Sequence, residues 1–471
     1  MKTFKAKSEA SQKPKPQGGA SQLARVKREL EARQINKVKL GGFDIDGVFR
    51  GKYVSMEKFF GAAEGGLGFC DVVFGWDIAD VLYDNAKVTG WHTGYPDAHA
   101  TIDLSSMRFI PWEPGTAAFI MDFVNPDGSP LPASPRQLLQ KMADRAEAMG
   151  LSPKFSAEFE YFIFKETAQS LRQKGFANLE PLSPGMFGYS WLRSSANAEL
   201  VHALLDGCRA FDIPIEGMHT ETGPGVYESA IQYDEVRRSA DKAALFKNVV
   251  KELCARRDLT ACFMAKWNEK LPGCSGHLHQ SMVGLKDGKS RFFDAADAHG
   301  MSPTMRHYLG GLVKLMPELT AIYWPTVNAY KRSVENTWAP TTATWGYENR
   351  TTAIRIIQGG AKATRIEYRQ TGADINPYLC MAANLAAGLW GIENHIEPPP
   401  PTQGNGYADS KAPPLPRNLR DAVRLLDGSK TARKILGDDF VNHYVATREW
   451  EVRQFERAVT NWELERYFEL A

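Results

Sequence analysis

The chain has 471 residues, 43% of them hydrophobic, and a formal net charge of +2, so it can bury a large core, most simply in two domains, and its charge indicates neither nucleic acid nor a membrane surface as a partner. No apolar run approaches the roughly 18 residues of a spanning helix, and no apolar segment follows the lysine-rich start as in a secretory signal. The six cysteines form no C-x-x-C pair, so we expect reduced thiols and a cytoplasmic protein.

The N-terminal part is expected to be a basic tail followed by a β-rich domain. Residues 1–34 comprise a tail, disordered to about residue 22, and a short amphipathic helix from Leu23 to about Gln34. From Val38 to about Pro130, strand-like runs alternate with Gly, Asp and Pro turns: VKLGGFDIDGVFRGKYV, ATIDL, MRFIPW and AAFIMDFV. We therefore predict a small domain over residues 35–131, with the linker NPDGSPLPASP at 125–135.

Residues 132–471 are expected to form a larger domain of helices and strands. Its first helix is PRQLLQKMADRAEAMG, with Pro135 near the first turn and Gly150 past the end. Further helices are predicted near 196–211, 235–257 and 378–396, strands near 154–164, 262–267 and 277–282, and a rigid surface loop, PPPPTQGNG, at 398–406. From Asp438 onward the chain is predicted to be helical, with Phe455, Val459 and Trp462 packed into the core.

The strand KFSAEFEYFIF, residues 154–164, carries two acidic residues between aromatic ones. Glu158 and Glu160 are two apart, so they point to the same face with Cα atoms roughly 6.5–7 Å apart. Two such carboxylates repel each other unless a cation lies between them. The alternative is a solvated edge strand.

Five other segments carry residues of the same chemical kinds. HTETGPGVYES contributes Glu221 and Glu228, PGCSGHLHQS contributes His277 and His279, and the segments at 328–340, 345–356 and 363–379 contribute Arg332, Arg350, Arg355, Arg365, Glu367 and Arg369. Taken singly, the histidine pair is as often a buried structural pair, and R-x-E-x-R is commonly a surface ladder of ion pairs.

Taken together, these residues indicate a metal and phosphate site. Mg²⁺ or Mn²⁺ prefers carboxylate oxygens with an occasional imidazole, and arginines bind phosphate and carboxylate groups. Two divalent ions would bring four positive charges, which the carboxylates at 158, 160, 221, 228 and 367 roughly balance. Phosphoryl transfer needs such positioning and charge neutralisation. We therefore expect an ATP-using, two-metal enzyme with an acidic substrate.

The order of the motifs E-x-E, E-x-G-P-G-x-Y-E, G-x-S-G-H-x-H-x-S, N-x-Y-K-R, N-R-x-x-x-I-R and R-x-E-x-R resembles the glutamine synthetase family from about residue 38 to the end. The resemblance implies an α+β fold: a small N-terminal β-grasp domain and a large C-terminal catalytic domain with a curved antiparallel sheet flanked by helices. It also implies self-association into rings, usually dodecamers, with active sites between subunits.

The resemblance assigns roles to individual residues. One metal would be held by Glu160, Glu221 and Glu228, and the second, next to the phosphates of ATP, by Glu158, His277 and Glu367. Arg332 and Arg369, with the backbone near Gly273, resemble the residues that bind L-glutamate, whereas Arg350 and Arg355 resemble those on the transferring phosphoryl group. The residues in nucleotide-binding positions are Glu216, His279, Ser281, Lys362 and Arg365. The implied cofactors are ATP and two or more Mg²⁺ or Mn²⁺ ions, and the implied reaction proceeds through γ-glutamyl phosphate to an amide.

The amine end departs from the family pattern. Ammonia-using members have K-R-L-x-P-x-x-E-A-P, with a glutamate near the loop end; here the loop reads KRSVENTWAP and the matching position is Trp338. Glu335, three residues earlier, does not occupy the same position. The aspartate that helps to bind ammonium matches Asp77 in FGWDIADV, and Ile78, Ala79 and Asp80 replace the small residues that follow it. PPPPTQGNG stands in the region of the regulatory tyrosine loop of bacterial ammonia enzymes.

A site that exchanges a carboxylate for an indole is expected to prefer an organic amine. We therefore predict a glutamate–amine ligase for an alkyl-, aryl- or polyamine, of a kind that serves amine catabolism and nitrogen metabolism. Trp338 and Trp76 favour a monoamine with an apolar body, whereas Asp80 leaves a polyamine open. The alternatives are that Trp338 only packs its loop, that the enzyme is an ordinary ammonia-using glutamine synthetase, or that it is an inactive structural relative.

Overall fold

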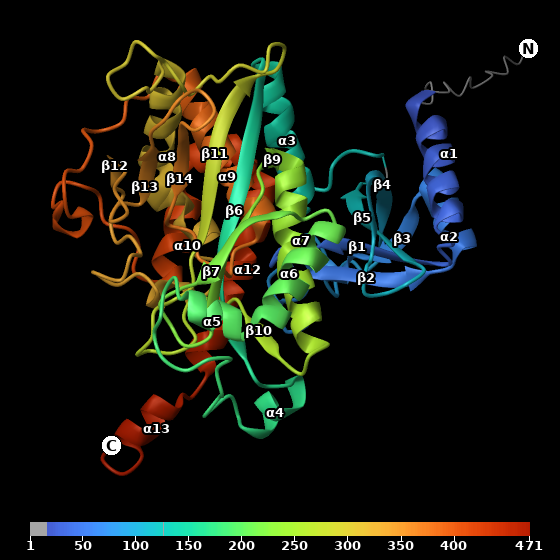
Figure 1. Ribbon diagram of the computed structural model, residues 1–471, viewed down its shortest axis with the longest axis horizontal. Helices are drawn as coiled ribbons and strands as arrows, with labels where there is room; N and C mark the ends of the chain where they lie inside the picture. Colours follow the sequence, from blue (N-terminus) through green and yellow to red (C-terminus); the bar gives the residue numbers. More distant parts are fainter. Residues whose placement is uncertain (1–16, 126) are drawn as a thin grey trace, which may run out of the picture.

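The computed structural model describes residues 17–125 and 127–471 and contains two β-sheets. The smaller sheet and its helices are formed by α1 (Gln17–Ala32), β1 (Lys37–Phe43), β2 (Phe49–Val54), α2 (Met56–Gly65), β3 (Leu67–Cys70), the 3-10 helix η1 (Asp71–Phe74), β4 (Asp97–Phe109) and β5 (Thr116–Val124). Its strand order is β2-β1-β5-β4-β3, with β1 and β5 parallel and the other pairs antiparallel. Figure 1 shows this sheet at one end of the molecule, with α1 at its outer side.

The small sheet contains the strand-like runs that the sequence predicted. ATIDL and MRFIPW are two parts of the single strand β4, whose register shifts between Asp103 and Arg108. The helix α2 was not predicted; its Phe59 is fully buried and packs on Phe119 of β5, with ring centroids 4.7 Å apart. The predicted disorder to about residue 22 is wrong for residues 17–22, which begin α1, and residues 1–16 lie outside the described part.

The larger sheet is antiparallel apart from one pair, as the sequence led us to expect. It consists of β6 (Leu151–Phe164), β7 (Ile215–Thr220), β8 (Val226–Ile231), β9 (Asp234–Glu235), β10 (Thr260–Cys262), β11 (Gly276–Gly284), β12 (Trp345–Tyr347), β13 (Ile354–Ile357) and β14 (Arg365–Tyr368). The strand order is β12-β13-β14-β11-β6-β8-β7, β9 and β10 also pair with β6, and only β12 and β13 run parallel. The strand predicted at 262–267 is wrong, since β10 ends at Cys262.

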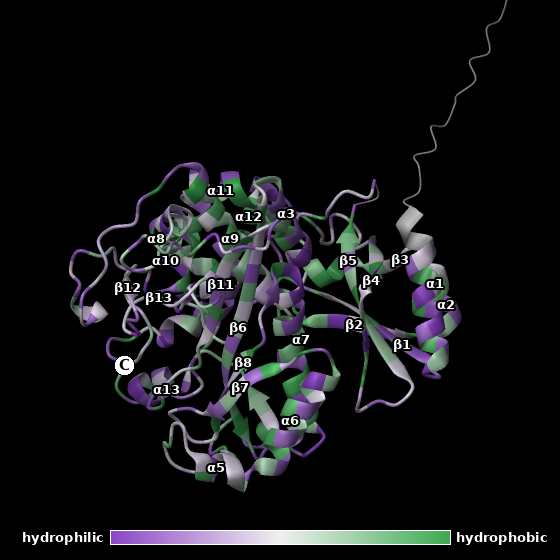
Figure 2. Cartoon of the chain, turned by 45° about the horizontal axis from the view of Figure 1, so that its top comes forward, coloured by the Kyte–Doolittle hydropathy of each residue, from purple (hydrophilic) through white to green (hydrophobic). Residues whose placement is uncertain are grey.

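Helices surround this sheet and complete the larger unit. They are α3 (Pro135–Ala148), α4 (Ala168–Gln173), α5 (Trp191–Ala196), α6 (Ala198–Ala210), α7 (Val236–Ala255), α8 (Pro303–Tyr323), η2 (Ala329–Lys331), α9 (Pro377–Glu393), η3 (Gly406–Ala408), α10 (Leu419–Gly428), α11 (Lys430–Leu436), α12 (Asp438–Arg457) and α13 (Asn461–Tyr467). Figure 2 shows that the outer helices α1 and α6 carry hydrophobic and hydrophilic residues on different sides. The helix α9 is buried along nearly its whole length, which fits its almost continuous apolar sequence.

The strand β6 separates the core from the face that carries its acidic residues. Phe159 and Tyr161 are fully buried and pack on Phe246 of α7, with ring centroids 6.2 and 5.9 Å apart. Because neighbouring side chains of a strand alternate between its faces, Glu158 and Glu160 point away from this aromatic layer. Packing of the aromatic face therefore fixes where the two carboxylates lie.

A buried cluster of charged residues joins the two sheets. The guanidinium of Arg136, on α3, donates to Asp103 of β4 and Asp122 of β5, both at 2.6 Å, and to Asp241 of α7 at 2.8 Å. Arg237 donates to the first two of these aspartates, at 2.9 and 3.0 Å. The cluster thus ties β4 and β5 of the small sheet to α3 and α7 of the larger unit. The domain limits 35–131 and 132–471 remain predictions.

The end of the chain does not pack as expected. Phe455, Val459 and Trp462 are 44%, 71% and 60% exposed, so the prediction that they pack into the core is wrong. In Figure 1, α13 projects away from the rest of the molecule. Within residues 17–125 and 127–471, no helix combines the length and the apolar character needed to cross a membrane.

Candidate functional site

A cavity of about 2430 Å³ lies on the face of the large sheet that carries Glu158 and Glu160. Its lining contains every site residue predicted from the sequence except Asp77: Glu158, Glu160, Glu216, Glu221, Glu228, Gly273, His277, His279, Ser281, Arg332, Trp338, Arg350, Arg355, Lys362, Arg365, Glu367 and Arg369. Residues from distant parts of the sequence thus share one cleft, as the metal and phosphate interpretation requires.

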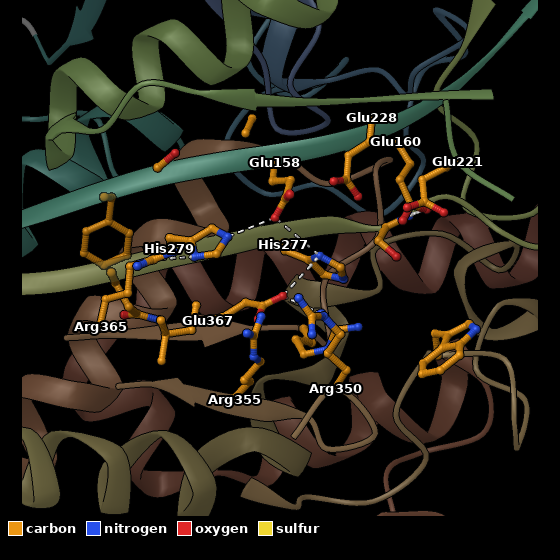
Figure 3. A pocket seen from close by; sticks show the side chains of 18 of the residues that line it. Glu158, Glu160, Glu221, Glu228, His277, His279, Arg350, Arg355, Arg365 and Glu367 are labelled. Atoms are coloured by element: carbon orange, nitrogen blue, oxygen red, sulfur yellow. Dashed lines mark hydrogen bonds and ion pairs between the residues drawn. The ribbon is translucent and has the colours of Figure 1, made fainter. Parts of the chain in front are cut away.

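Strand pairing brings the charged residues together. The residue pairs that face each other across neighbouring strands are Glu158 and His277, Glu160 and Glu228, His279 and Glu367, and Glu367 and Arg355. Cross-strand partners lie close enough for their side chains to interact. Figure 3 shows that the acidic side chains of β6 and β8 point toward the histidines and arginines of the neighbouring strands.

Two tight groups of possible metal ligands result. Glu158, His279 and Glu367 form one, and His219, Glu221 and Glu228 form the other, with the ligand atoms of each group within 4.8 Å of one another. His219 was not singled out from the sequence, although its position two residues before Glu221 was a usable signal. Its Nε2 lies 2.9 Å from Glu228 Oε1.

The other two predicted ligands, Glu160 and His277, lie beside these groups. Glu160 Oε2 accepts a hydrogen bond of 2.6 Å from the backbone N–H of Ser275. His277 Nδ1 is 3.5 Å from Glu367 Oε1, and its Nε2 is buried without a hydrogen-bond partner in the described part of the chain. An unpartnered buried imidazole nitrogen has a desolvation cost that a metal ion would offset.

The electrostatics of the carboxylates also fit bound cations. Burial, together with the neighbouring Glu158 carboxylate, raises the pKa of Glu228 far above its usual range. The pKa of Glu158 is lowered: burial opposes its ionisation, but the hydrogen bonds from His277 and His279 have the larger combined effect. Since Glu228 retains a proton next to ionised neighbours, a divalent ion that displaces this proton would relieve the repulsion.

The histidine of the second predicted set is available as a neutral ligand. Burial and the nearby charge of Arg369 lower the pKa of His277 to about 4, so its imidazole is neutral near pH 7. Burial opposes the ionisation of Glu367, but the positive charge of Arg369 lowers its pKa to about 2. Neutral imidazole and ionised carboxylate are the forms that bind metal ions, so these residues fit Mg²⁺ or Mn²⁺.

Arg332 is held rigidly at one side of the cavity. It is buried, and it donates to Ser275 Oγ at 2.8 Å and to the carbonyl oxygen of Gln370 at 3.1 Å. Gly273 lies directly against it: a Cβ at this position would come within 2.4 Å of the Ala265 carbonyl oxygen and 2.9 Å of Arg332 Cγ. Glycine is therefore needed here for the close approach of the backbone.

Arg355 bridges two carboxylates. It donates to Glu367 Oε2 at 3.0 Å and to Glu348 Oε2 at 2.6 Å, while Glu348 Oε1 accepts from the backbone N–H of Gln358 at 2.8 Å. Glu348, which was not predicted from the sequence, has a left-handed φ of 48°. On the neighbouring strand β14, Arg365 donates to His279 Nδ1 at 3.3 Å.

Asp77 lies outside the cavity of its own chain. Its Oδ1 accepts from the backbone N–H groups of Ala79 and Val81, at 2.9 and 3.0 Å, and its Oδ2 accepts from Trp450 Nε1 at 2.9 Å. These contacts fix the loop that carries Asp77 on the surface of α12.

Trp338 lies in the wall of the cavity, in a loop of residues 333–339 that we call the Trp338 loop. The side chain is 64% exposed, and both Asn336 and Trp338 have a left-handed φ of 63°. Val334 of the same loop and Met186 also line the cavity. The cavity wall near Trp338 therefore contains apolar groups, while the assignment of this wall to the amine remains a prediction.

The chain is similar to known proteins along most of its length. Residues 132–467 match the family model described as glutamine synthetase, catalytic domain. A relative named type-1 glutamine synthetase 2, from Dictyostelium discoideum, is 49% identical over 437 residues, 92% of this chain and 84% of the relative. A glutamate–isopropylamine ligase from Pseudomonas sp. is 38% identical over 452 residues, 95% of this chain and 98% of the relative.

A solved structure has the same fold. A complex of GmaS with ADP superimposes with a TM-score of 0.82 at 27% identity, covering 95% of this chain and 99% of the other. The resemblance inferred from the motifs and the α+β fold class are both confirmed. Because the family model covers well over half of the chain and the relatives align along nearly all of it, the protein belongs to the glutamine synthetase family of ligases.

Proposed function

We propose that the protein is an ATP-dependent glutamate–amine ligase, which joins L-glutamate to an organic amine through γ-glutamyl phosphate. The single observation that carries this choice is Trp338 in the wall of the cavity, where ammonia-using members have a carboxylate. The names of the relatives do not decide between ammonia and an organic amine as the substrate, since one is called a glutamine synthetase and another a glutamate–isopropylamine ligase. The choice between them therefore depends on the chemistry of the Trp338 loop.

The proposed metal sites use the carboxylates and histidines of the sheet. We infer that Glu160, Glu221 and Glu228 hold one ion, with His219 beside them, and that Glu158, His277 and Glu367 hold the ion next to the phosphates of ATP. The crowded carboxylates and the unpartnered His277 Nε2 support this assignment. Bound Mg²⁺ or Mn²⁺ would neutralise the charge that develops on the transferring phosphoryl group.

The arginines divide between the two substrates. We propose that Arg332 and Arg369, with the backbone of Gly273, bind L-glutamate, because Arg332 is buried and fixed by Ser275. Arg350 and Arg355 would bind the transferring phosphoryl group. The residues proposed to bind the nucleotide, all of which line the cavity, are Glu216, His279, Ser281, Lys362 and Arg365.

The preferred amine is proposed to be a monoamine with an apolar body. Trp338 and Val334 give the opening an apolar wall that ammonium cannot use but an alkyl or aryl group can. Asp80, which left a polyamine open, is paired with Arg50 at 2.6 Å, so its charge is already compensated. The guanidinium carbon of Arg50 lies 5.0 Å from the centroid of the Trp76 ring, and Trp76 is outside the cavity of its own chain.

The assembly and the compartment are part of the proposal. We propose rings, dodecamers in the simplest case, in which the loop of Asp77 reaches the site of a neighbouring subunit. The exposed apolar residues at the C-terminal end, which include Phe455, Val459 and Trp462, give such an assembly a surface to bury. The six cysteines are unpaired, which supports a cytoplasmic enzyme of amine catabolism.

A panel of amines tests the proposal. Glutamate-dependent phosphate release from ATP is measured with ammonia, alkylamines, anilines, ethanolamine and polyamines, and we expect the highest kcat/KM with an apolar monoamine. Efficient turnover of ammonia alone would instead establish the ordinary glutamine synthetase. Absence of glutamate-dependent phosphate release with every amine would establish an inactive relative.

Trp338→Glu is the sharper test. It restores the carboxylate of ammonia-using members, so the ratio of kcat/KM for ammonia to that for the best amine should rise by about 100-fold, the range of one changed pocket contact. Phe176→Glu is a matched control, because Phe176 is 65% exposed, has a left-handed φ of 60° and lies outside the cavity. An unmoved ratio in Trp338→Glu would reject the role of the indole.

A further inference from the structure

A segment outside the cavity is hydrogen-bonded to two loops that line the cavity. Residues 402–409, which we call the strap, follow the proline run and contain η3; none of them lines the cavity. On one side the strap binds the turn that carries Arg350: Asn349 Nδ2 donates to the Gly404 carbonyl at 2.8 Å, and the Gly406 N–H donates to Thr351 Oγ1 at 2.8 Å. The strap is thus fixed against the phosphoryl end of the site.

On its other side the strap binds the end of the Trp338 loop. The hydroxyl of Tyr407 donates to the carbonyl oxygen of Ala339, the residue directly after Trp338, at 3.0 Å. Ala339 is buried, whereas Trp338 is mostly exposed, so the bond lies at the point where the loop re-enters the protein. Tyr407 is partly buried, and the backbone N–H groups of Thr337 and Trp338 also act on its hydroxyl, so the contact with the loop extends beyond Ala339.

The Trp338 loop needs such support. Asn336 and Trp338 both adopt a left-handed φ that L residues rarely take, so the surroundings must hold this conformation. The beginning of the loop follows Arg332, which Ser275 and Gln370 anchor independently of the strap. Within the loop, Ser333 Oγ donates to the Pro340 carbonyl at 2.7 Å and Thr337 Oγ1 donates to the Val334 carbonyl at 2.6 Å. Loss of the Tyr407 bond would therefore loosen the indole without unfolding the loop or releasing the arginine.

We propose that Tyr407 is a positioning residue for the amine end of the site: its hydroxyl holds the Trp338 loop in place, so that the indole selects the amine and shields γ-glutamyl phosphate from water. This inference rests on the proposed function. Tyr407 acts through the loop, since it does not reach the cavity itself.

Tyr407→Phe tests the inference because it removes only the hydroxyl. We expect the KM for the amine to rise by about 5- to 10-fold, the effect of one lost hydrogen bond. The phosphate released per amide formed should rise above the wild-type value, because water then competes for the acyl phosphate. The KM values for glutamate and ATP should stay within about twofold, since Arg332 keeps its own anchors.

A readout without substrates accompanies the kinetics. Hydrogen exchange of residues 333–339 should become faster in Tyr407→Phe, with unchanged exchange in β6 and β11. Tyr53→Phe is the control: this residue lies on β2 of the small sheet, and its hydroxyl donates to Glu113 at 2.7 Å. Removal of that hydroxyl should leave the exchange of 333–339 and the amine KM unchanged.

The outcomes separate this inference from the proposed function. A wild-type enzyme that uses ammonia alone would reject the proposed function, and with it the selection of an amine by Tyr407. If the wild type prefers an amine, the function stands whatever Tyr407→Phe does. The inference is overturned if the exchange of 333–339 is unchanged in Tyr407→Phe. It is also overturned if neither the amine KM nor the phosphate released per amide formed changes.

Discussion

Relative to the wild type, Glu160→Gln should be more stable without metal and should gain less stability when metal is added. Burial raises the pKa of Glu160 to about 7, against an ordinary value of 4.5. The backbone N–H of Ser275 can donate to a glutamine oxygen as it does to Glu160 Oε2, so the substitution keeps this contact. The variant therefore removes the charge and little else.

The size of the effect follows from the pKa. A carboxyl whose pKa is raised by folding holds its proton more tightly in the folded chain, so stability is lost as pH rises from about 4.5 to about 7. At about 1.36 kcal/mol per pKa unit, this loss amounts to about 3 kcal/mol in the wild type. Glu160→Gln has no such carboxyl, so its advantage over the wild type should be absent near pH 4.5 and reach about 3 kcal/mol near pH 7.

The measurement is urea unfolding of both proteins, first with a chelator and then with Mn²⁺. A divalent ion present at about 100 times its Kd stabilises the folded wild type by about 2.7 kcal/mol, and the variant should lose much of this gain. Equal stability of the two metal-free proteins near pH 7, or equal stabilisation of both by Mn²⁺, would refute the reasoning.

Three further predictions concern other parts of the chain. Arg136→Met leaves buried aspartates without their partner and should lower the free energy of unfolding by about 3 kcal/mol; unchanged urea unfolding would show that the cluster does not join the sheets. Gly273→Ala places a Cβ 2.4 Å from the Ala265 carbonyl and should raise the KM for glutamate about tenfold, whereas Gly65→Ala, with open space around it, should not; equal KM values would contradict this account of the glutamate end. His443 is buried with both ring nitrogens unpartnered among the described residues, and burial lowers its pKa to about 4, so the unfolded chain takes up the proton first as pH falls below 6.5. Stability is lost from pH 6.5 down to about 4, and His443→Phe should reduce the difference in unfolding free energy between pH 7 and pH 5; an unchanged difference would exclude this histidine as the cause.

The residues that line the cavity could be predicted because local patterns in the sequence determine which side chains share a face. The two-residue spacing of Glu158 and Glu160 determines a shared face on any strand, and the order of the motifs supplied the rest of the cleft. His219 was missed although the same alternation applies to it. Its contact with Glu228 depends on the pairing of β7 with β8, which the spacing alone does not give.

The helix α8 was missed because its sequence contains helix-breaking residues. Gly310 and Gly311 lie in its middle, and Pro317 follows them. The structure explains the glycines: a Cβ at either position would come within 2.1 Å of a backbone oxygen near α9, so their absence of a side chain lets the two helices pack closely. Such a requirement exists only in the folded molecule.

The C-terminal segment shows the opposite error. The apolar spacing of Phe455, Val459 and Trp462 predicted a helix face in the core, but these side chains are exposed because the chain breaks between α12 and α13 and turns away from the body. In the described part of the chain, no surface covers this hydrophobic face. Tyr407 could not be predicted for a similar reason, since its contact with Ala339 joins segments 68 residues apart in the sequence.

Anomalous diffraction from crystals soaked with Mn²⁺ and a nucleotide tests the central claim most directly. The account predicts two manganese peaks in the cavity, one among Glu160, Glu221 and Glu228 and the other among Glu158, His277 and Glu367. Peaks absent from this cleft, with the six side chains paired only to one another and to arginines, would contradict it.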